Sequence, residues 1–171
     1  MDFLRPCQRM NESESLCITG PEEMLVLGMT VGKHVFDGAV IGLSGPMGVG
    51  KTTLVRGVAE GMGITEGHSV SSPTFTILQS YPCRELTLYH LDLYRISGRE
   101  DLDSTGYRDV FGGSGVIVIE WVEREPDSMT PENLIIEMEY EEIGRKVVFS
   151  PKGDAYRSLA SSVIDEYLIL H

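Results

Sequence analysis

Residues 39–52 read Ala39-Val40-Ile41-Gly42-Leu43-Ser44-Gly45-Pro46-Met47-Gly48-Val49-Gly50-Lys51-Thr52. The first five residues form a short apolar run, which predicts a buried strand. The last eight match the pattern Gly-x-x-x-x-Gly-Lys-Thr of a phosphate-binding P-loop. The glycines of such a loop let backbone N–H groups turn inward around phosphates, and the helix that follows directs its positive end at the same anions. The stretch therefore predicts a strand, a phosphate-binding loop and a helix in succession.

The P-loop also predicts the ligand, which is ATP or ADP with Mg2+. Lys51 would reach the β- and γ-phosphates, and the Thr52 hydroxyl would bind Mg2+. Pro46 has no N–H, so one possible amide donor is absent. The predicted phosphate-binding residues within the motif are Gly45, Gly48, Val49, Gly50, Lys51 and Thr52.

Helical and extended patterns alternate on both sides of this motif. Capping signals and apolar spacing predict helices from about 21 to 36, 51 to 61, 99 to 111, and from 156 onward. Apolar runs predict strands at 39–43, near 79, and at 86–93, 116–119, 134–140 and 146–149, the last two forming a hairpin around Gly144. This order is typical of an α/β P-loop NTPase, with a central, mostly parallel sheet flanked by helices and a C-terminal β-hairpin and helix.

The length of 171 residues fits one domain. We expect a loose N-terminal arm at 1–15 and a single domain at 16–171. The net charge of −12 opposes autonomous binding to nucleic acid, so we expect no DNA binding. The start lacks a signal-peptide pattern, no apolar run could span a membrane, and the three cysteines are scattered. These features favour a reduced, cytoplasmic protein.

Two carboxylates stand where predicted strands end. Glu120 follows the apolar run 116–119, and Asp92 lies in the segment 90–95, His90-Leu91-Asp92-Leu93-Tyr94-Arg95. Open α/β sheets bind ligands at these ends, and a P-loop enzyme needs an acid to hold Mg2+ and often another group to orient water. Either carboxylate alone could be a solvated strand end, and His90 an ordinary hydrogen-bonded strand residue.

Two further features have both a functional and a structural interpretation. The segment 72–76, Ser72-Pro73-Thr74-Phe75-Thr76, lies where switch segments of P-loop proteins sense the γ-phosphate, but by itself it is a turn before a strand. Trp121 could lie against the nucleotide or simply pack in the core.

Taken together, residues 45–53, 72–76, 90–95 and the pair Glu120-Trp121 closely resemble the TsaE (YjeE) family, over about 19 to 146. The resemblance implies a weak ATPase that acts with the TsaB–TsaD heterodimer, in which TsaD forms threonylcarbamoyladenosine at position 37 of tRNA. ATP turnover would reset that complex, and tRNA would be contacted only indirectly. The family usually has Asp, Leu and Ala where this chain has Pro46, Met47 and Val49.

The resemblance also assigns roles to individual residues. It implies that Thr53 joins Lys51 and Thr52 at the phosphates and Mg2+, and that Trp121 lies near the nucleotide. The residues implied as catalytic are Asp92, Glu120 and Thr74, with Asp92 and Glu120 also at the metal. Those implied beside the base are Glu23, Gly144 and Arg145.

Two other classes of protein stay open on the sequence. A small-molecule or nucleoside kinase shares the P-loop but needs an acceptor pocket and a lid, neither of which is evident. A nucleotide-gated binding module would need no hydrolysis. Stimulation of ATP turnover by TsaB–TsaD would favour the ATPase that the resemblance implies, and stimulation by a small acceptor would favour the kinase.

Overall fold

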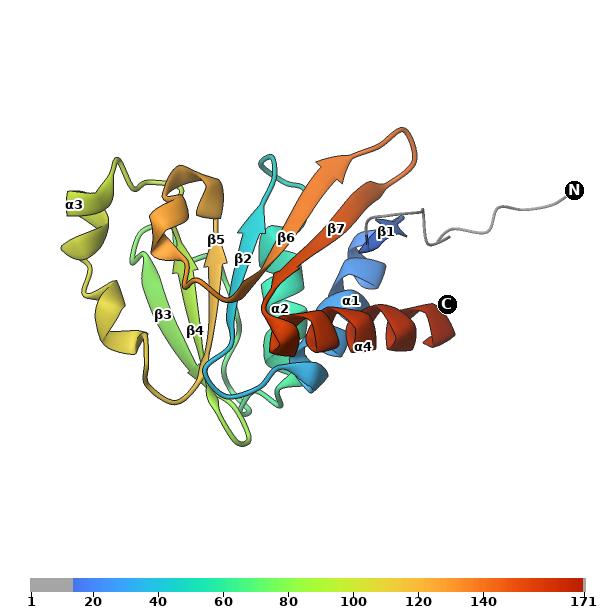
Figure 1. The fold of residues 1–171 in the computed structure, drawn as a ribbon, viewed down its shortest axis with the longest axis horizontal. Coiled ribbons are helices and arrows are strands. Elements are labelled where there is room, and N and C mark those ends of the chain that lie inside the picture. The colour runs from blue at the N-terminus through green and yellow to red at the C-terminus, as the bar shows by residue number, and fades with distance from the viewer. Residues whose placement is uncertain (1–13, 171) are drawn as a thin grey trace, which may run out of the picture.

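A seven-stranded sheet forms the centre of the computed structural model, which describes residues 14–170 (Figure 1). The strands, in their order across the sheet, are β1 (Glu14–Ile18), β7 (Arg145–Lys152), β6 (Asn133–Tyr140), β2 (Val40–Ser44), β5 (Val116–Glu120), β4 (Thr87–Asp92) and β3 (Leu78–Pro82). Strand β1 was not predicted. Glu14 and Ser15, which we expected in a loose arm, begin this edge strand, and the rest of that arm lies outside the described residues.

The middle of the sheet is parallel. Strands β6, β2, β5 and β4 pair parallel to one another, whereas β7, β1 and β3 join at the edges through antiparallel pairs. The predicted hairpin is present as β6 and β7, but β6 also pairs with β2, so the hairpin is part of the main sheet. Strand β1 is antiparallel to β7 and so points the same way as the four central strands, which makes five of the seven strands run in one direction. The predicted α/β class with a central, mostly parallel sheet is therefore confirmed.

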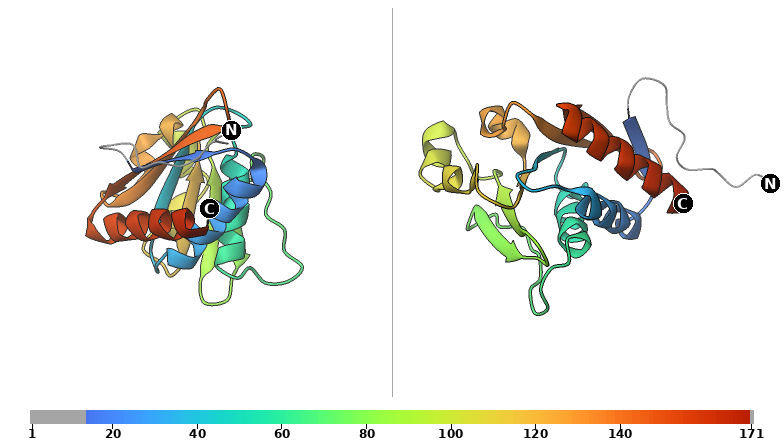
Figure 2. Two further views of the ribbon diagram at one scale, coloured as in Figure 1. Left: turned by 90° about the vertical axis from the view of Figure 1, so that its right-hand side faces the viewer. Right: turned by 60° about the horizontal axis from the view of Figure 1, so that its bottom comes forward.

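Helices cover both faces of the sheet (Figures 1 and 2). One face packs on α1 (Pro21–His34), α2 (Lys51–Gly61) and α4 (Asp154–Leu170). The other packs on α3 (Arg99–Asp103) and the 3-10 turns η1 (Tyr107–Val110) and η2 (Val122–Arg124), with η3 (Pro126–Ser128) beyond them. Strand β5 is buried on both faces, since Val118 faces the first cluster and Ile119 the second. This double burial is why its sequence is continuously apolar.

Helix α1 crosses α2 at unusually close range because both helices present glycines at the contact. A Cβ atom at Gly28 would lie 2.3 Å from the Leu54 carbonyl oxygen, and one at Gly57 would lie 2.3 Å from the Leu25 oxygen. Gly32 and Gly61 repeat the pattern one turn further on. The backbone of α1 therefore rests directly on the helix that begins at the P-loop.

The predicted end of one helix was wrong. Helix α3 ends at Asp103 instead of near 111, because Gly106 adopts a left-handed conformation with φ of 72° and a 3-10 turn follows. At α1 the N-cap is Gly20, and Glu23 accepts hydrogen bonds from the backbone N and the hydroxyl of Thr19. Among residues 14–170 no helix is both long enough and apolar enough to cross a membrane.

Candidate functional site: a P-loop pocket at the ends of three parallel strands

The P-loop follows β2 and has the backbone conformation that its glycines predict. Gly45, Gly48 and Gly50 have φ values of 133°, 76° and 121°, a region that other residues rarely adopt. Gly45 also passes so close to β6 that a Cβ there would lie 2.3 Å from the Met138 oxygen. Gly50 is the N-cap of α2, so the positive end of this helix opens into the loop.

Lys51 lies at the mouth of the loop and is only 4% exposed. Its Nζ donates to the carbonyl oxygens of Gly45 and Pro46 at 2.6 and 2.9 Å, and it lies 3.7 Å from the ring centroid of Trp121. Burial lowers the pKa of Lys51, and the nearby charges of Glu120, Glu123 and Asp92 partly offset that effect. Because this ammonium group is already desolvated, it would attract an anion bound in the loop more strongly than an exposed lysine would.

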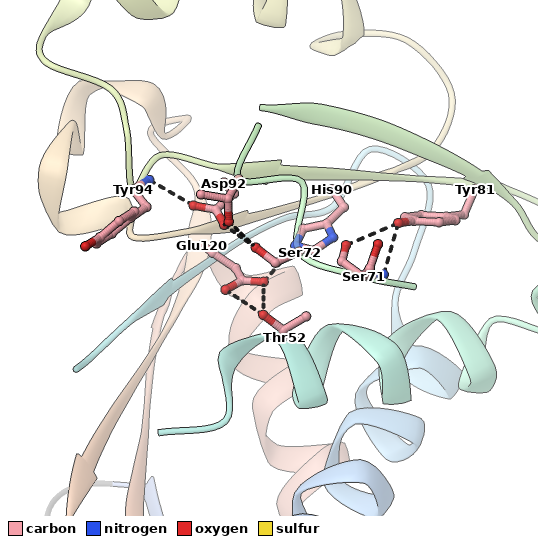
Figure 3. A network of polar contacts seen from close by, with 9 residues as sticks. Thr52, Ser71, Ser72, Tyr81, His90, Asp92, Tyr94 and Glu120 are labelled. Carbon is pink, nitrogen blue, oxygen red and sulfur yellow. Dashed lines mark hydrogen bonds and ion pairs between the residues drawn. The ribbon is translucent and has the colours of Figure 1, made fainter. Parts of the chain in front are cut away.

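Glu120 connects the end of β5 to the start of α2 (Figure 3). The Thr52 hydroxyl lies 2.8 and 3.1 Å from the two carboxylate oxygens, and His90 Nε2 lies 2.8 Å from Oε1. Glu120 is 2% exposed and His90 is fully buried. The carboxylate is therefore held in one orientation by two donors from different elements.

Asp92 connects the end of β4 to the segment 72–76 (Figure 3). Its Oδ2 accepts hydrogen bonds from Ser72 Oγ at 2.5 Å and Thr74 Oγ1 at 2.9 Å, and its Oδ1 accepts one from the Tyr94 backbone at 2.8 Å. Ser71, the residue before the segment, is tied to β3, where the Tyr81 hydroxyl contacts its backbone. These contacts place the predicted switch segment directly over the carboxylate.

Sheet geometry explains why these side chains meet. Asp92 and Glu120 are register partners on the adjacent parallel strands β4 and β5. Side chains two residues apart share a face, so His90 lies on the same face as Asp92, toward α2. This period of two was a signal in the sequence for His90, which we did not assign to the site. Two other residues that we missed differ in this respect. Tyr94 contacts Asp92 locally, through its own backbone N–H two residues further on, whereas Ser72 meets Asp92 only through the tertiary fold.

The backbone is strained next to this site. Among the described residues, Ile77 and Trp121 are the non-glycine residues with positive φ, at 66° and 60°. Such conformations cost about 1–3 kcal/mol and persist where the surrounding structure holds them. Trp121 also packs on the Tyr94 ring, at 5.1 Å between centroids. With this left-handed backbone conformation, the indole of Trp121 lies beside Lys51, next to the P-loop.

A pocket of about 300 Å3 brings most of the predicted site residues together. Those lining it are Gly48, Gly50, Lys51, Thr52, Thr53, Thr74, Asp92, Glu120 and Trp121, joined by Met47, Ser72 and Tyr94. Gly45, the first residue of the loop, packs against Met138, and the Val49 side chain is fully buried in the core. Each of these two residues can therefore contribute only its backbone to phosphate binding.

The three residues assigned to the base do not line this pocket. Glu23 is bonded to Thr19 at the start of α1, and Gly144 presses against β1, where a Cβ would lie 2.3 Å from the Ile18 oxygen. Arg145 lies over the ring of Tyr140, whose hydroxyl donates to the Met47 carbonyl of the P-loop. Arg145 thus approaches the loop through Tyr140, and base binding by all three stays a prediction.

The donor set suits Mg2+ held together with a nucleotide. Among residues 14–170 no group of three or more His, Cys, Asp or Glu side chains could hold a metal by itself. Mg2+ usually binds proteins through one or two carboxylates together with water and substrate phosphates. Thr52, Glu120 and Asp92 supply oxygens of that kind beside the phosphate loop.

The sheet order and the glycine-rich loop after β2 show that the protein has the fold of the P-loop nucleoside triphosphatases. Residues 18–147 match the family model described as threonylcarbamoyl adenosine biosynthesis protein TsaE. The chain belongs to the TsaE family, as the sequence motifs predicted.

Curated relatives and a solved structure agree with this assignment. The TsaE proteins of Bacillus subtilis and Treponema pallidum are 34% and 46% identical to the chain, over 84% and 57% of its length and 89% and 70% of theirs. The crystal structure of Bacillus subtilis YdiB superposes with a TM-score of 0.74 and 31% identity, covering 93% of this chain and 99% of that one.

Proposed function

We propose that this protein binds ATP with Mg2+, hydrolyses it weakly alone, and serves as the ATPase subunit required for threonylcarbamoyladenosine formation at position 37 of tRNA. It would act in the cytoplasm with a TsaB–TsaD heterodimer, and ATP hydrolysis would reset that complex between cycles. The name of the family and of its curated relatives supports the pathway. The observation that carries the ATPase proposal is the meeting of Lys51, Thr52, Asp92 and Glu120 in one pocket.

The residues divide the work between binding and turnover. The P-loop amides and Lys51 would hold the phosphates, and Thr52 and Glu120 would hold Mg2+, which neutralises charge developing on the transferred phosphoryl group. Asp92 would accept a hydrogen bond from the attacking water. In the described structure the hydroxyls of Ser72 and Thr74 donate hydrogen bonds to Oδ2 of Asp92, where the water would bind. The segment 72–76 would therefore shift when the γ-phosphate arrives.

The high negative charge supports an indirect role toward tRNA. At −12 the chain repels a phosphate backbone, whereas a protein partner needs only local complementarity. The transfer of the threonylcarbamoyl group would belong to the partner.

Substitution of the two carboxylates tests this function. Asp92→Asn and Glu120→Gln should keep nucleotide affinity within about tenfold, because the loop amides and Lys51 bind the phosphates in both variants. Each should lower ATP hydrolysis in the presence of TsaB–TsaD by about 100-fold or more, since transition-state stabilisation is lost. Each should also stop tRNA modification after the first cycle.

The assays are nucleotide binding followed by the emission of Trp121, the single tryptophan, ATP turnover, and tRNA modification over many cycles. Hydrolysis at the unsubstituted rate by both variants would show that the carboxylates are not catalytic. Loss of hydrolysis with continued multiple-turnover modification would refute the resetting role alone.

A further inference from the structure

His90 is a buried titratable residue that the proposed function leaves without a task. Its side chain is fully buried in β4, and it does not line the nucleotide pocket. Nε2 lies 2.8 Å from Oε1 of Glu120, and Nδ1 is buried without a hydrogen-bond partner among the described residues. The ring therefore reaches the site only through Glu120 (Figure 3).

The chemistry of the pair fixes which atom donates. An ionised carboxylate only accepts hydrogen bonds, so the contact requires a proton on Nε2 of His90. In the neutral ring this leaves Nδ1 as a bare acceptor, which agrees with its lack of a donor. Glu120, at 2% exposure, takes its second donor from Thr52. Oε1 therefore has two donors, His90 Nε2 and the Thr52 hydroxyl. Removing His90 would leave the Thr52 hydroxyl to hold the carboxylate by itself, and the carboxylate would be freer to turn.

We propose that His90 is a positioning residue, whose Nε2–H holds the Glu120 carboxylate toward the Thr52 hydroxyl and so sets the affinity of the site for its divalent cation. The inference rests on the proposed function, in which Thr52 and Glu120 bind Mg2+. Partners that orient metal-binding side chains commonly change metal affinity by about 10–100-fold when removed.

Three variants of the full chain, compared with the unsubstituted chain, test the donor separately from the ring. His90→Phe keeps a ring and removes the donor. His90→Gln carries an amide N–H that can reach the position of Nε2, and His90→Asn carries the same amide one bond short. Mn2+, which replaces Mg2+ and is visible by electron paramagnetic resonance, is titrated into each protein saturated with ADP. ADP affinity is measured separately in EDTA.

The proposed role of His90 predicts a definite pattern of Mn2+ and ADP affinities. His90→Phe and His90→Asn should bind Mn2+ about 10–100-fold more weakly than the unsubstituted chain, and His90→Gln should recover most of the loss. ADP affinity in EDTA should stay within about twofold in all of them, because His90 does not line the pocket in which the P-loop and Lys51 would bind the phosphates. If the phenylalanine variant does not fold, the contrast between Gln and Asn decides the matter.

Three results would overturn the inference. The first is Mn2+ affinity unchanged in both His90→Phe and His90→Asn. The second is an equal loss in the Gln and Asn variants, which would assign His90 to packing alone. The third is no Mn2+ binding by the unsubstituted ADP complex, and this result also removes the metal from the proposed function. The first two leave that function standing.

Discussion

The close crossing of α1 and α2 gives a prediction whose size can be worked from the structure. In Gly57→Ala the new Cβ would lie 2.3 Å from the Leu25 carbonyl oxygen and 2.8 Å from the Gly28 Cα. Close C···O contacts in proteins are about 3.3–3.6 Å, so the overlap is about 1 Å. Both obstructing atoms belong to the backbone of α1 and cannot rotate away. The two helices must move apart.

Two opposing terms set the change in the free energy of unfolding. Replacing a helical glycine by alanine stabilises the helix by about 1 kcal/mol. Overpacking a close-packed contact costs about 1–3 kcal/mol, occasionally more, and an obstructing backbone places this case at the upper end. We therefore expect a net loss of about 2 kcal/mol. For a domain of this size the melting temperature should fall by about 4–8 °C.

The assay is thermal and urea unfolding of the ligand-free protein, followed by circular dichroism. Gly113→Ala is the matched control, because its Cβ would lie 3.7 Å from the nearest atom, the Val110 oxygen. That variant should unfold at or slightly above the original temperature, since it only restricts the unfolded chain. A Gly57→Ala protein as stable as the unsubstituted one would refute the backbone contact between the helices.

Two further predictions concern charged side chains. Lys51→Met should abolish ATP binding, measured by calorimetry. The melting temperature of the ligand-free protein should stay equal or rise, because burial lowers the pKa of Lys51 and so makes its charge unfavourable to folding. A large fall in melting temperature would contradict this. At the α1–α4 contact, hydrogen bonds from Lys33 and His34 hold the pKa of Glu166 below its usual 4.5. The stability that ionised Glu166 contributes is therefore present above pH 4.5 and is lost as the pH falls through the lowered pKa. Melting temperatures of the original chain and of Glu166→Gln should differ slightly at pH 6 and converge at acid pH, and a constant difference would refute the pairing.

The sequence by itself determined the parts of the site that depend on neighbouring residues. The P-loop conformation follows from glycines at fixed spacing, which alone accept the positive φ values found at Gly45, Gly48 and Gly50. The continuous apolar run of β5 implied burial on both faces, and so placed Glu120 at a strand end. The family motifs then identified Asp92 and Thr74 as its companions.

Tertiary structure decided everything that depends on which distant segments become adjacent. Strand β1 has a weak local pattern and exists as the edge partner of β7, whose residues lie far along the chain. The pairing of β6 with β2, the donation by His90 to Glu120 and by Ser72 to Asp92, and the glycine contact of α1 with α2 likewise join remote residues. Local spacing specifies a backbone conformation and a face, but a hydrogen bond or a close contact needs its partner, and only the folded sheet brings that partner within reach.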